Sequence, residues 1–85
     1  MNRLMVITAE YGGALKLVYD FEGEMDEERL ISVLREKGII FRNKVRYREK
    51  LRWFDRAGWE VLDGRGKPIY VAFVGKKPHG TPARL

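Results

Sequence analysis

The 85-residue chain contains no cysteine and no glutamine. Without cysteine there can be no disulfide, thiolate nucleophile or cysteine-ligated zinc, and this absence favours a reducing, cytoplasmic setting. No apolar run approaches the roughly 20 residues of a membrane-spanning helix, and no secretion-type N-terminus is visible, so we expect no membrane association. The lack of glutamine beside abundant Glu, Lys and Arg is typical of proteins from hot habitats.

Residues for catalysis are equally scarce. The single serine, Ser32, lies in a predicted helix, and the single histidine, His79, lies in the tail, so a serine triad would have to join distant segments. Acidic residues gather at 22–28 and could hold a cation, but the positive end of a helix dipole already explains carboxylates there. We therefore expect no catalytic residue, no metal site and no cofactor.

What the chain has in quantity is charge, and it is unevenly placed. With 45% hydrophobic and 34% charged residues, the sequence predicts one globular domain over residues 1–75, followed by a mobile basic tail over 76–85. Residues 1–38 hold five basic and eight acidic side chains, a net charge of −3, whereas residues 39–85 hold twelve and four, a net charge of +8. This split predicts a positive surface on one side of the domain.

The first half of the chain has clear local signals. Residues 3–10 and 14–21 are predicted strands, and Gly12-Gly13 between them favours a tight hairpin turn. In the second strand Leu15, Leu17, Tyr19 and Phe21 recur with a period of two, with Lys16 and Asp20 on the other face. A helix follows, with Asp26 as its N-cap and Gly38 as its stop.

Residues 41–62, "FRNKVRYREKLRWFDRAGWEVL", are ambiguous and hold seven of the seventeen Lys and Arg. Residues 41–48 alternate as a strand does. However, Tyr47, Leu51, Phe54 and Gly58 fall at helical spacing, and most of the intervening residues are good helix formers. We favour a short extended piece around 39–44 and a helix from about 46 to 57 that ends at Gly58. Asn43 could instead cap a longer helix.

The end of the domain is predicted to be two strands, 59–63 and 69–75, joined by the turn "GRGKP". The last strand is apolar on both faces, which indicates a central position with its second face covered by the tail or by another copy of the chain, and we expect a homodimer. The predicted fold class is α+β: an antiparallel sheet of four or five strands with two helices packed on one face.

Residues 51–78, "LRWFDRAGWEVLDGRGKPIYVAFVGKKP", resemble the C-terminal half of a family of small uncharacterised bacterial and phage α/β domains. The family pattern is a short helix, "GWELV", a loop and a strand ending in "FKRP". The matching residues are Leu51, Gly58, Trp59, Glu60, Val61, Phe73 and Pro78. Gly75 departs from the pattern at the strand end. The resemblance implies helix–strand–strand order and, because the family has no settled activity, no function.

The basic segment carries the functional prediction. On a helix, Arg48, Arg52 and Arg56 would form one stripe suited to a phosphate backbone, because each neutralised phosphate releases counterion. Trp53 on the flank of this stripe could stack on an unpaired base or pack against the sheet. Arg65 and Lys67 form a second patch in "RGKP", which resembles the AT-hook core, although turn chemistry explains its glycines and proline equally well.

We expect a non-catalytic basic protein that binds DNA or RNA through phosphate contacts. Strong sequence specificity is not indicated, because helix-turn-helix and zinc-finger patterns are absent. The alternative is a small adaptor or inhibitor, of the kind a phage encodes, that docks a basic face on an acidic host protein. The predicted nucleic-acid contacts are Arg42, Lys44, Arg46, Arg48, Arg52, Trp53, Arg56, Arg65 and Lys67.

Overall fold

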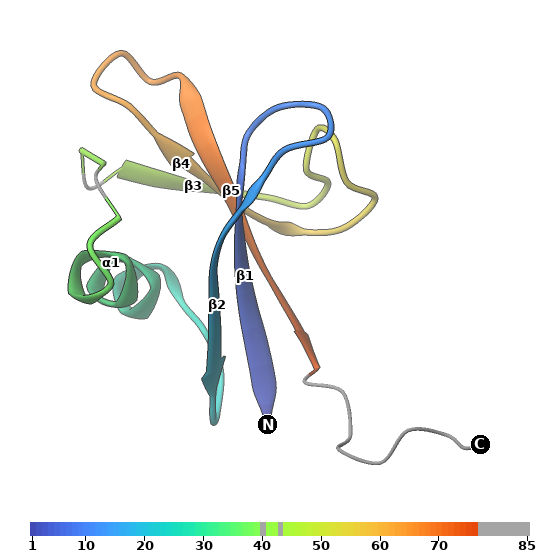
Figure 1. The fold of residues 1–85 in the computed structure, drawn as a ribbon, viewed down its shortest axis with the longest axis vertical. Coiled ribbons are helices and arrows are strands. Elements are labelled where there is room, and N and C mark those ends of the chain that lie inside the picture. The colour runs from blue at the N-terminus through green and yellow to red at the C-terminus, as the bar shows by residue number, and fades with distance from the viewer. Residues whose placement is uncertain (40, 43, 77–85) are drawn as a thin grey trace.

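A computed structural model describes residues 1–39, 41–42 and 44–76. Within these ranges the chain forms five strands and one helix: β1 (Asn2–Thr8), β2 (Leu15–Phe21), α1 (Glu27–Glu36), β3 (Lys44–Arg48), β4 (Gly58–Leu62) and β5 (Pro68–Lys76). The strands make a single sheet in the order β2-β1-β5-β4-β3, and every neighbouring pair is antiparallel. In Figure 1, α1 lies on one side of the sheet and the β3–β4 loop, in yellow, lies on the other.

The N-terminal hairpin and the helix confirm the local signals. Asp26 is the N-cap of α1, and its carboxylate accepts the backbone N–H of Arg29 at 2.8 Å. At the other end Gly38 has φ +78°, and the N–H of Ile39 donates to the Leu34 carbonyl, so that a left-handed glycine closes the helix.

The expectation of two helices is wrong: the described residues form one helix on a mostly β fold. The predicted helix over 46–57 is absent, because Lys44–Arg48 is strand β3 and residues 49–57 form turns. Pairing with β4 decides this segment. Val45 lies opposite Val61, and the Tyr47 ring meets the Trp59 ring edge-on with centroids 5.5 Å apart. These cross-strand contacts outweigh the helix propensity of the local sequence.

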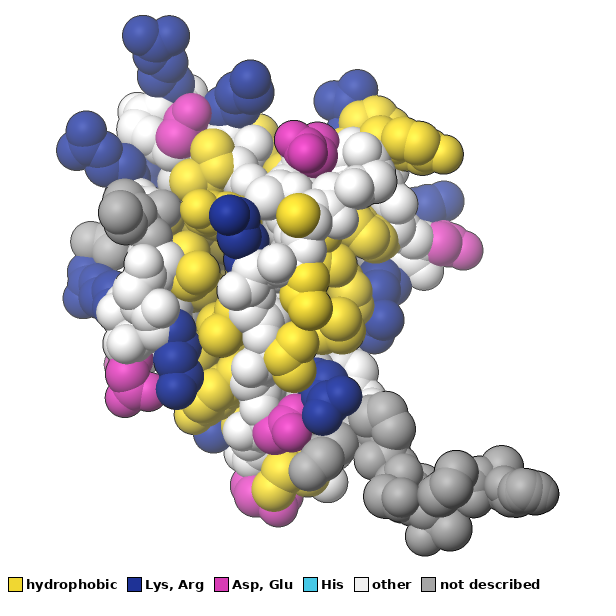
Figure 2. Space-filling model, in the orientation of Figure 1, with side chains coloured by type: hydrophobic (Ala, Val, Ile, Leu, Met, Phe, Trp, Pro, Cys, Tyr) yellow, Lys and Arg dark blue, Asp and Glu magenta, His cyan; other side chains and the backbone are white. Residues whose placement is uncertain are grey.

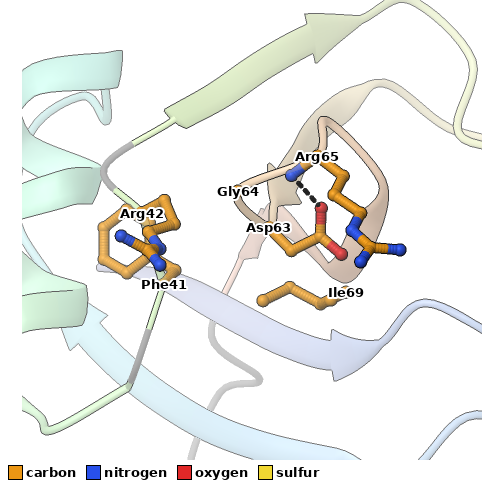
Figure 3. Close-up of a pocket in the computed structure, with 6 residues that line it drawn as sticks. All are labelled: Phe41, Arg42, Asp63, Gly64, Arg65 and Ile69. Carbon is orange, nitrogen blue, oxygen red and sulfur yellow. Dashed lines mark hydrogen bonds between the residues drawn. The ribbon is translucent and has the colours of Figure 1, made fainter.

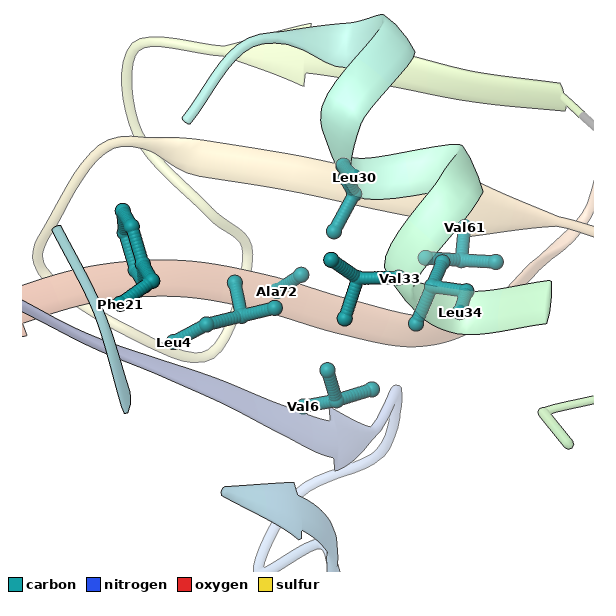
Figure 4. Close-up of a cluster of buried hydrophobic side chains, with 8 residues drawn as sticks. All are labelled: Leu4, Val6, Phe21, Leu30, Val33, Leu34, Val61 and Ala72. Atoms are coloured by element: carbon teal, nitrogen blue, oxygen red, sulfur yellow. The ribbon is translucent and has the colours of Figure 1, made fainter. Parts of the chain in front are cut away.

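The main core lies between α1 and the sheet (Figure 4). Three helix residues point down onto the sheet and are buried: Leu30, Val33 and Leu34. They meet buried side chains from β1, β2, β4 and β5, namely Leu4, Val6, Phe21, Val61 and Ala72. Helix and sheet therefore share one apolar layer.

The opposite face of the sheet has a smaller cluster, supplied by the β3–β4 loop. Leu51, fully buried, packs with Val71 and Phe73 of β5, and Phe54 adds to them. This confirms β5 as a central strand that is apolar on both sides, and it shows that the chain's own loop covers part of the second face. Lys76, the first residue of the predicted tail, ends β5, and the rest of that tail, 77–85, lies outside the described residues. The homodimer stays a prediction.

Gly58 shows why the β3–β4 loop can seat so closely. It starts β4, and the role predicted for it as a helix stop is wrong. A Cβ there would lie 2.4 Å from the Ala72 carbonyl oxygen and 2.8 Å from a Leu51 methyl carbon, so the close approach requires glycine. Across the ranges described, no helix is both long and apolar enough to cross a membrane.

Candidate nucleic-acid interface

Strand β3 turns its basic residues away from α1. Val45 packs into the helix-side core, so its neighbours Lys44 and Arg46 point to the opposite face, as the alternation of a strand requires. Arg46 pairs across the sheet with Glu60 of β4: its Nε and Nη2 atoms donate to Oε1 at 2.9 and 2.6 Å. Arg48 Nη1 lies 3.7 Å from the same oxygen. Both arginine side chains remain half exposed.

Beside this ion pair lies a cavity of about 310 Å³, at the small end of ligand-sized pockets. The loop between β1 and β2, the loop between β3 and β4, and strands β4 and β5 all contribute to its lining. Six of the lining residues are Tyr11, Arg52, Trp53, Glu60, Lys67 and Val71. We refer to this cavity as the Glu60 pocket.

The aromatic residues of the Glu60 pocket stay accessible. Trp53 is 42% exposed and Tyr11 is 83% exposed, and their rings meet edge-on with centroids 5.6 Å apart. The Arg52 guanidinium carbon lies 4.9 Å from the centre of the Trp53 ring. Trp53 thus contacts neighbours without being buried by the sheet, and a flat ring system and a cation stand together at the surface.

Charge around the Glu60 pocket is positive. Four cationic side chains line it or contact its carboxylate: Arg46, Arg48, Arg52 and Lys67. Two carboxylates, Glu10 and Glu60, oppose them. The surplus of two positive charges favours an anionic ligand at this place.

Other predicted contacts do not join this group. The stripe of Arg48, Arg52 and Arg56 required a helix and does not form. Arg56 instead lies over the Phe73 ring, 4.3 Å from its centre, and its Nη2 donates to the Val74 carbonyl at 2.9 Å. In the view of Figure 2 the Lys and Arg side chains, in dark blue, are scattered over the visible face and its rim rather than gathered in one ridge.

Arg42 and Arg65 belong to a second, open cavity of about 400 Å³ (Figure 3). Arg42 stands with Phe41 on one side of it, and Arg65 stands with Asp63 on the other. The structure therefore divides the predicted residues between these two cavities and the separate position of Arg56. Arg46, Arg48, Arg52, Trp53 and Lys67 are grouped at the Glu60 pocket, and Lys44 follows on the same strand face.

The turn between β4 and β5 is held by Asp63. Its Oδ1 accepts the backbone N–H groups of Arg65 and Lys67 at 2.8 and 2.9 Å. The bond from Lys67, and then that from Arg65, lowers the pKa of the Asp63 carboxyl, because both favour its charged form. With Gly66 at φ +82°, residues 63–67 form a tight turn and Pro68 begins β5, a conformation that differs from the flat strand that an AT-hook lays into a minor groove.

Two residues of this site were missed by sequence reasoning. Glu60 is the single acidic residue within a strand of apolar neighbours, and that contrast could have marked it. Tyr11 sits in a hairpin loop, where nothing local indicates that it meets Trp53 more than forty positions away. Among the described residues, no three His, Cys, Asp or Glu side chains lie close enough together to hold a metal ion.

Comparison with family models, with curated proteins and with solved structures finds no match for this chain. The resemblance of residues 51–78 to small bacterial and phage domains stays a prediction. Its short helix has no counterpart here, because the residues before Gly58 form turns.

Proposed function

We propose that this protein is a non-catalytic, cytoplasmic binder of single-stranded nucleic acid that uses the sheet face opposite α1. The observation that carries the proposal is the exposed Trp53 ring beside Tyr11, with Arg52 against it and Lys67 in the same pocket. Proteins that hold single strands combine aromatic rings, on which bases stack, with cations that follow the backbone.

A single strand fits better than a duplex. The exposed ring of Trp53 can stack only on a base whose face is open, and paired bases in a duplex have no open face. The cations at this place come from a strand edge and two loops, and α1, the single helix of the described residues, lies on the other side of the sheet, so none of these cations sits on a helix that could enter a major groove. Phosphate contacts by Arg52 and Lys67 and by the half-exposed Arg46 and Arg48 would add affinity without reading sequence.

The test is fluorescence anisotropy with labelled single- and double-stranded DNA and RNA, titrated from low to physiological salt. Single strands should bind more tightly than duplexes, with log K falling against log salt by about 0.7 per phosphate neutralised. Trp53→Ala should weaken binding about tenfold through the lost stacking, and Arg52→Ala should flatten the salt dependence by about one phosphate. Quenching of tryptophan fluorescence on binding should disappear in Trp53→Phe.

Arg35→Ala is the matched control, because it removes the same charge from α1 on the other side of the sheet. It should leave affinity and salt dependence unchanged. If no oligonucleotide binds at low salt, the proposal is wrong. Docking of the basic face on an acidic protein then becomes the function to test. Equal losses in Arg35→Ala and Arg52→Ala would show that net charge acts rather than this site.

A further inference from the structure

Glu60 is the single buried charged residue among those described, with 7% of its surface exposed. A buried carboxylate is unfavourable unless hydrogen bonds and opposite charge compensate it. The hydrogen bonds and positive charges that compensate the Glu60 carboxylate all approach one of its two oxygens. Both donors of Arg46, and the more distant Arg48, approach Oε1.

The second oxygen, Oε2, accepts no hydrogen bond from the residues that the structure describes. It belongs to a side chain that lines the Glu60 pocket, as do Trp53, Tyr11 and the apolar Val71. A buried acceptor without a partner, on a side chain that lines a pocket, favours a ligand that brings a donor, because burying an acceptor without a hydrogen bond is unfavourable. Arg46 meanwhile occupies Oε1 with two bonds, so Oε2 is the oxygen that remains for a ligand.

We propose that the Glu60 pocket takes a guanine base of the bound strand, with Glu60 accepting from the Watson–Crick edge. This rests on the function proposed above. Because Arg46 occupies Oε1, the base must donate to Oε2. An ionised carboxylate only accepts, and guanine is the base that presents two adjacent donors on that edge, N1–H and the N2 amino group, which can share Oε2. Adenine and cytosine place a ring-nitrogen acceptor beside their single amino donor, and thymine places its N3–H between two carbonyls. Each of these would set a lone pair against the carboxylate.

The rest of the pocket suits the same occupant. The Trp53 ring provides a stacking surface for a purine, and Arg52 and Lys67 stand where the flanking phosphates would need cations. Glu10, the other carboxylate of the lining, is exposed and disfavours a second phosphate directly at the pocket. Phosphate contacts therefore set the register loosely, and one position in the strand is selective.

The experiment uses the full chain and a short oligothymidine strand whose central position is thymine, guanine, adenine, cytosine or hypoxanthine. The guanine strand should bind about 10- to 100-fold more tightly than oligothymidine, as a good base contact provides. Hypoxanthine keeps N1–H and lacks the amino group, so its strand should fall between the two. A ranking with any other base first, or equal affinity for guanine and hypoxanthine, would overturn the inference.

Glu60→Gln tests the residue. The amide oxygen can still accept from Arg46, while the amide nitrogen replaces Oε2 with a donor, so the preference for guanine should be lost and the salt dependence kept. A merely structural Glu60 would change the stability of the fold and leave the guanine–hypoxanthine ratio unchanged. If Glu60→Gln does not fold, the base series in the unaltered chain still decides.

Failure of this inference and failure of the proposed function give different results. Equal affinity for all five strands, with the losses in Trp53→Ala and Arg52→Ala retained, would remove guanine selection and leave single-strand binding standing. Absence of binding by every strand would remove both.

Discussion

The two faces of the sheet are built by different means. The face under α1 is closed by a capped helix whose three buried residues follow helical spacing, and its core is continuous across four strands. The opposite face is closed by a loop without regular structure, whose Leu51 and Phe54 reach a small apolar cluster. Beside that cluster lie a buried carboxylate and an exposed tryptophan. The helix face supplies stability, and the loop face leaves room for a site.

The largest effect on stability is expected at Gly58, where the β3–β4 loop meets the sheet. Gly58→Ala would place a methyl group 2.4 Å from the Ala72 carbonyl oxygen, a backbone atom that cannot move away cheaply. We expect the free energy of unfolding to fall by about 3 kcal/mol or more, as in severe overpacking. Urea denaturation followed by circular dichroism measures it.

Gly66→Ala is the matched control for that substitution. Gly66 has φ +82° and open space around it, so the cost should be about 1 kcal/mol from backbone strain alone. A cost for Gly58→Ala no greater than this would mean that the loop does not sit against β5 as described.

A second pair of substitutions compares the two faces directly. Leu34 of α1 and Leu51 of the loop are both fully buried, so Leu→Ala removes the same atoms. Leu34→Ala should cost about 3 kcal/mol, because the helix and the sheet cannot both collapse into the cavity. Leu51→Ala should cost about 2 kcal/mol, because a loop relaxes more readily.

Amide hydrogen exchange sharpens this comparison. Leu51→Ala should speed exchange in residues 49–57 and leave β1 and α1 protected, since the loop can open without the rest. Leu34→Ala should speed exchange throughout the sheet. Uniform acceleration by both variants would show that the two faces unfold as one unit.

The same contrast explains what could be predicted from the sequence. The Gly12-Gly13 turn, the Asp26 cap and the Gly38 stop are local signals, and the hairpin and α1 were predicted from them. The segment 41–62 has no such caps. Its conformation depends on partners elsewhere in the chain.

Two contacts show how the conformation of residues 41–62 depends on distant partners. Tyr47 needs Trp59 across the sheet, and Leu51 needs β5. The helical spacing of Tyr47, Leu51 and Phe54 therefore does not mark one face of a helix, because Tyr47 belongs to a strand and Leu51 and Phe54 belong to a loop on the other side of the sheet. The candidate site shows the same difference between local and long-range information. The sequence indicates which basic residues are candidates, but their grouping around Glu60 follows from the strand register that sets Arg46 opposite Glu60, and the local sequence does not contain that register.

The smallest stability effect expected here concerns the ion pair itself. Arg46→Ala leaves Glu60 buried, with Arg48 3.7 Å away as its remaining partner. Breaking a fully buried pair costs about 3–5 kcal/mol, but Arg46 is half exposed and Arg48 can move closer, so we expect about 1 kcal/mol. Lys44→Ala, on the same face of β3, is the control and should change the free energy of unfolding by less than about 0.5 kcal/mol.

The more informative measurement on Arg46→Ala is its binding to the oligonucleotide series. Because Arg46 occupies Oε1 and leaves Oε2 for the base, its loss should reduce the guanine preference more than it reduces affinity for oligothymidine. If Arg46→Ala lowered the affinities for the guanine strand and for oligothymidine by the same factor, Arg46 would act only as a phosphate contact. The loop face would then bind strands through charge, without a pocket that selects a base.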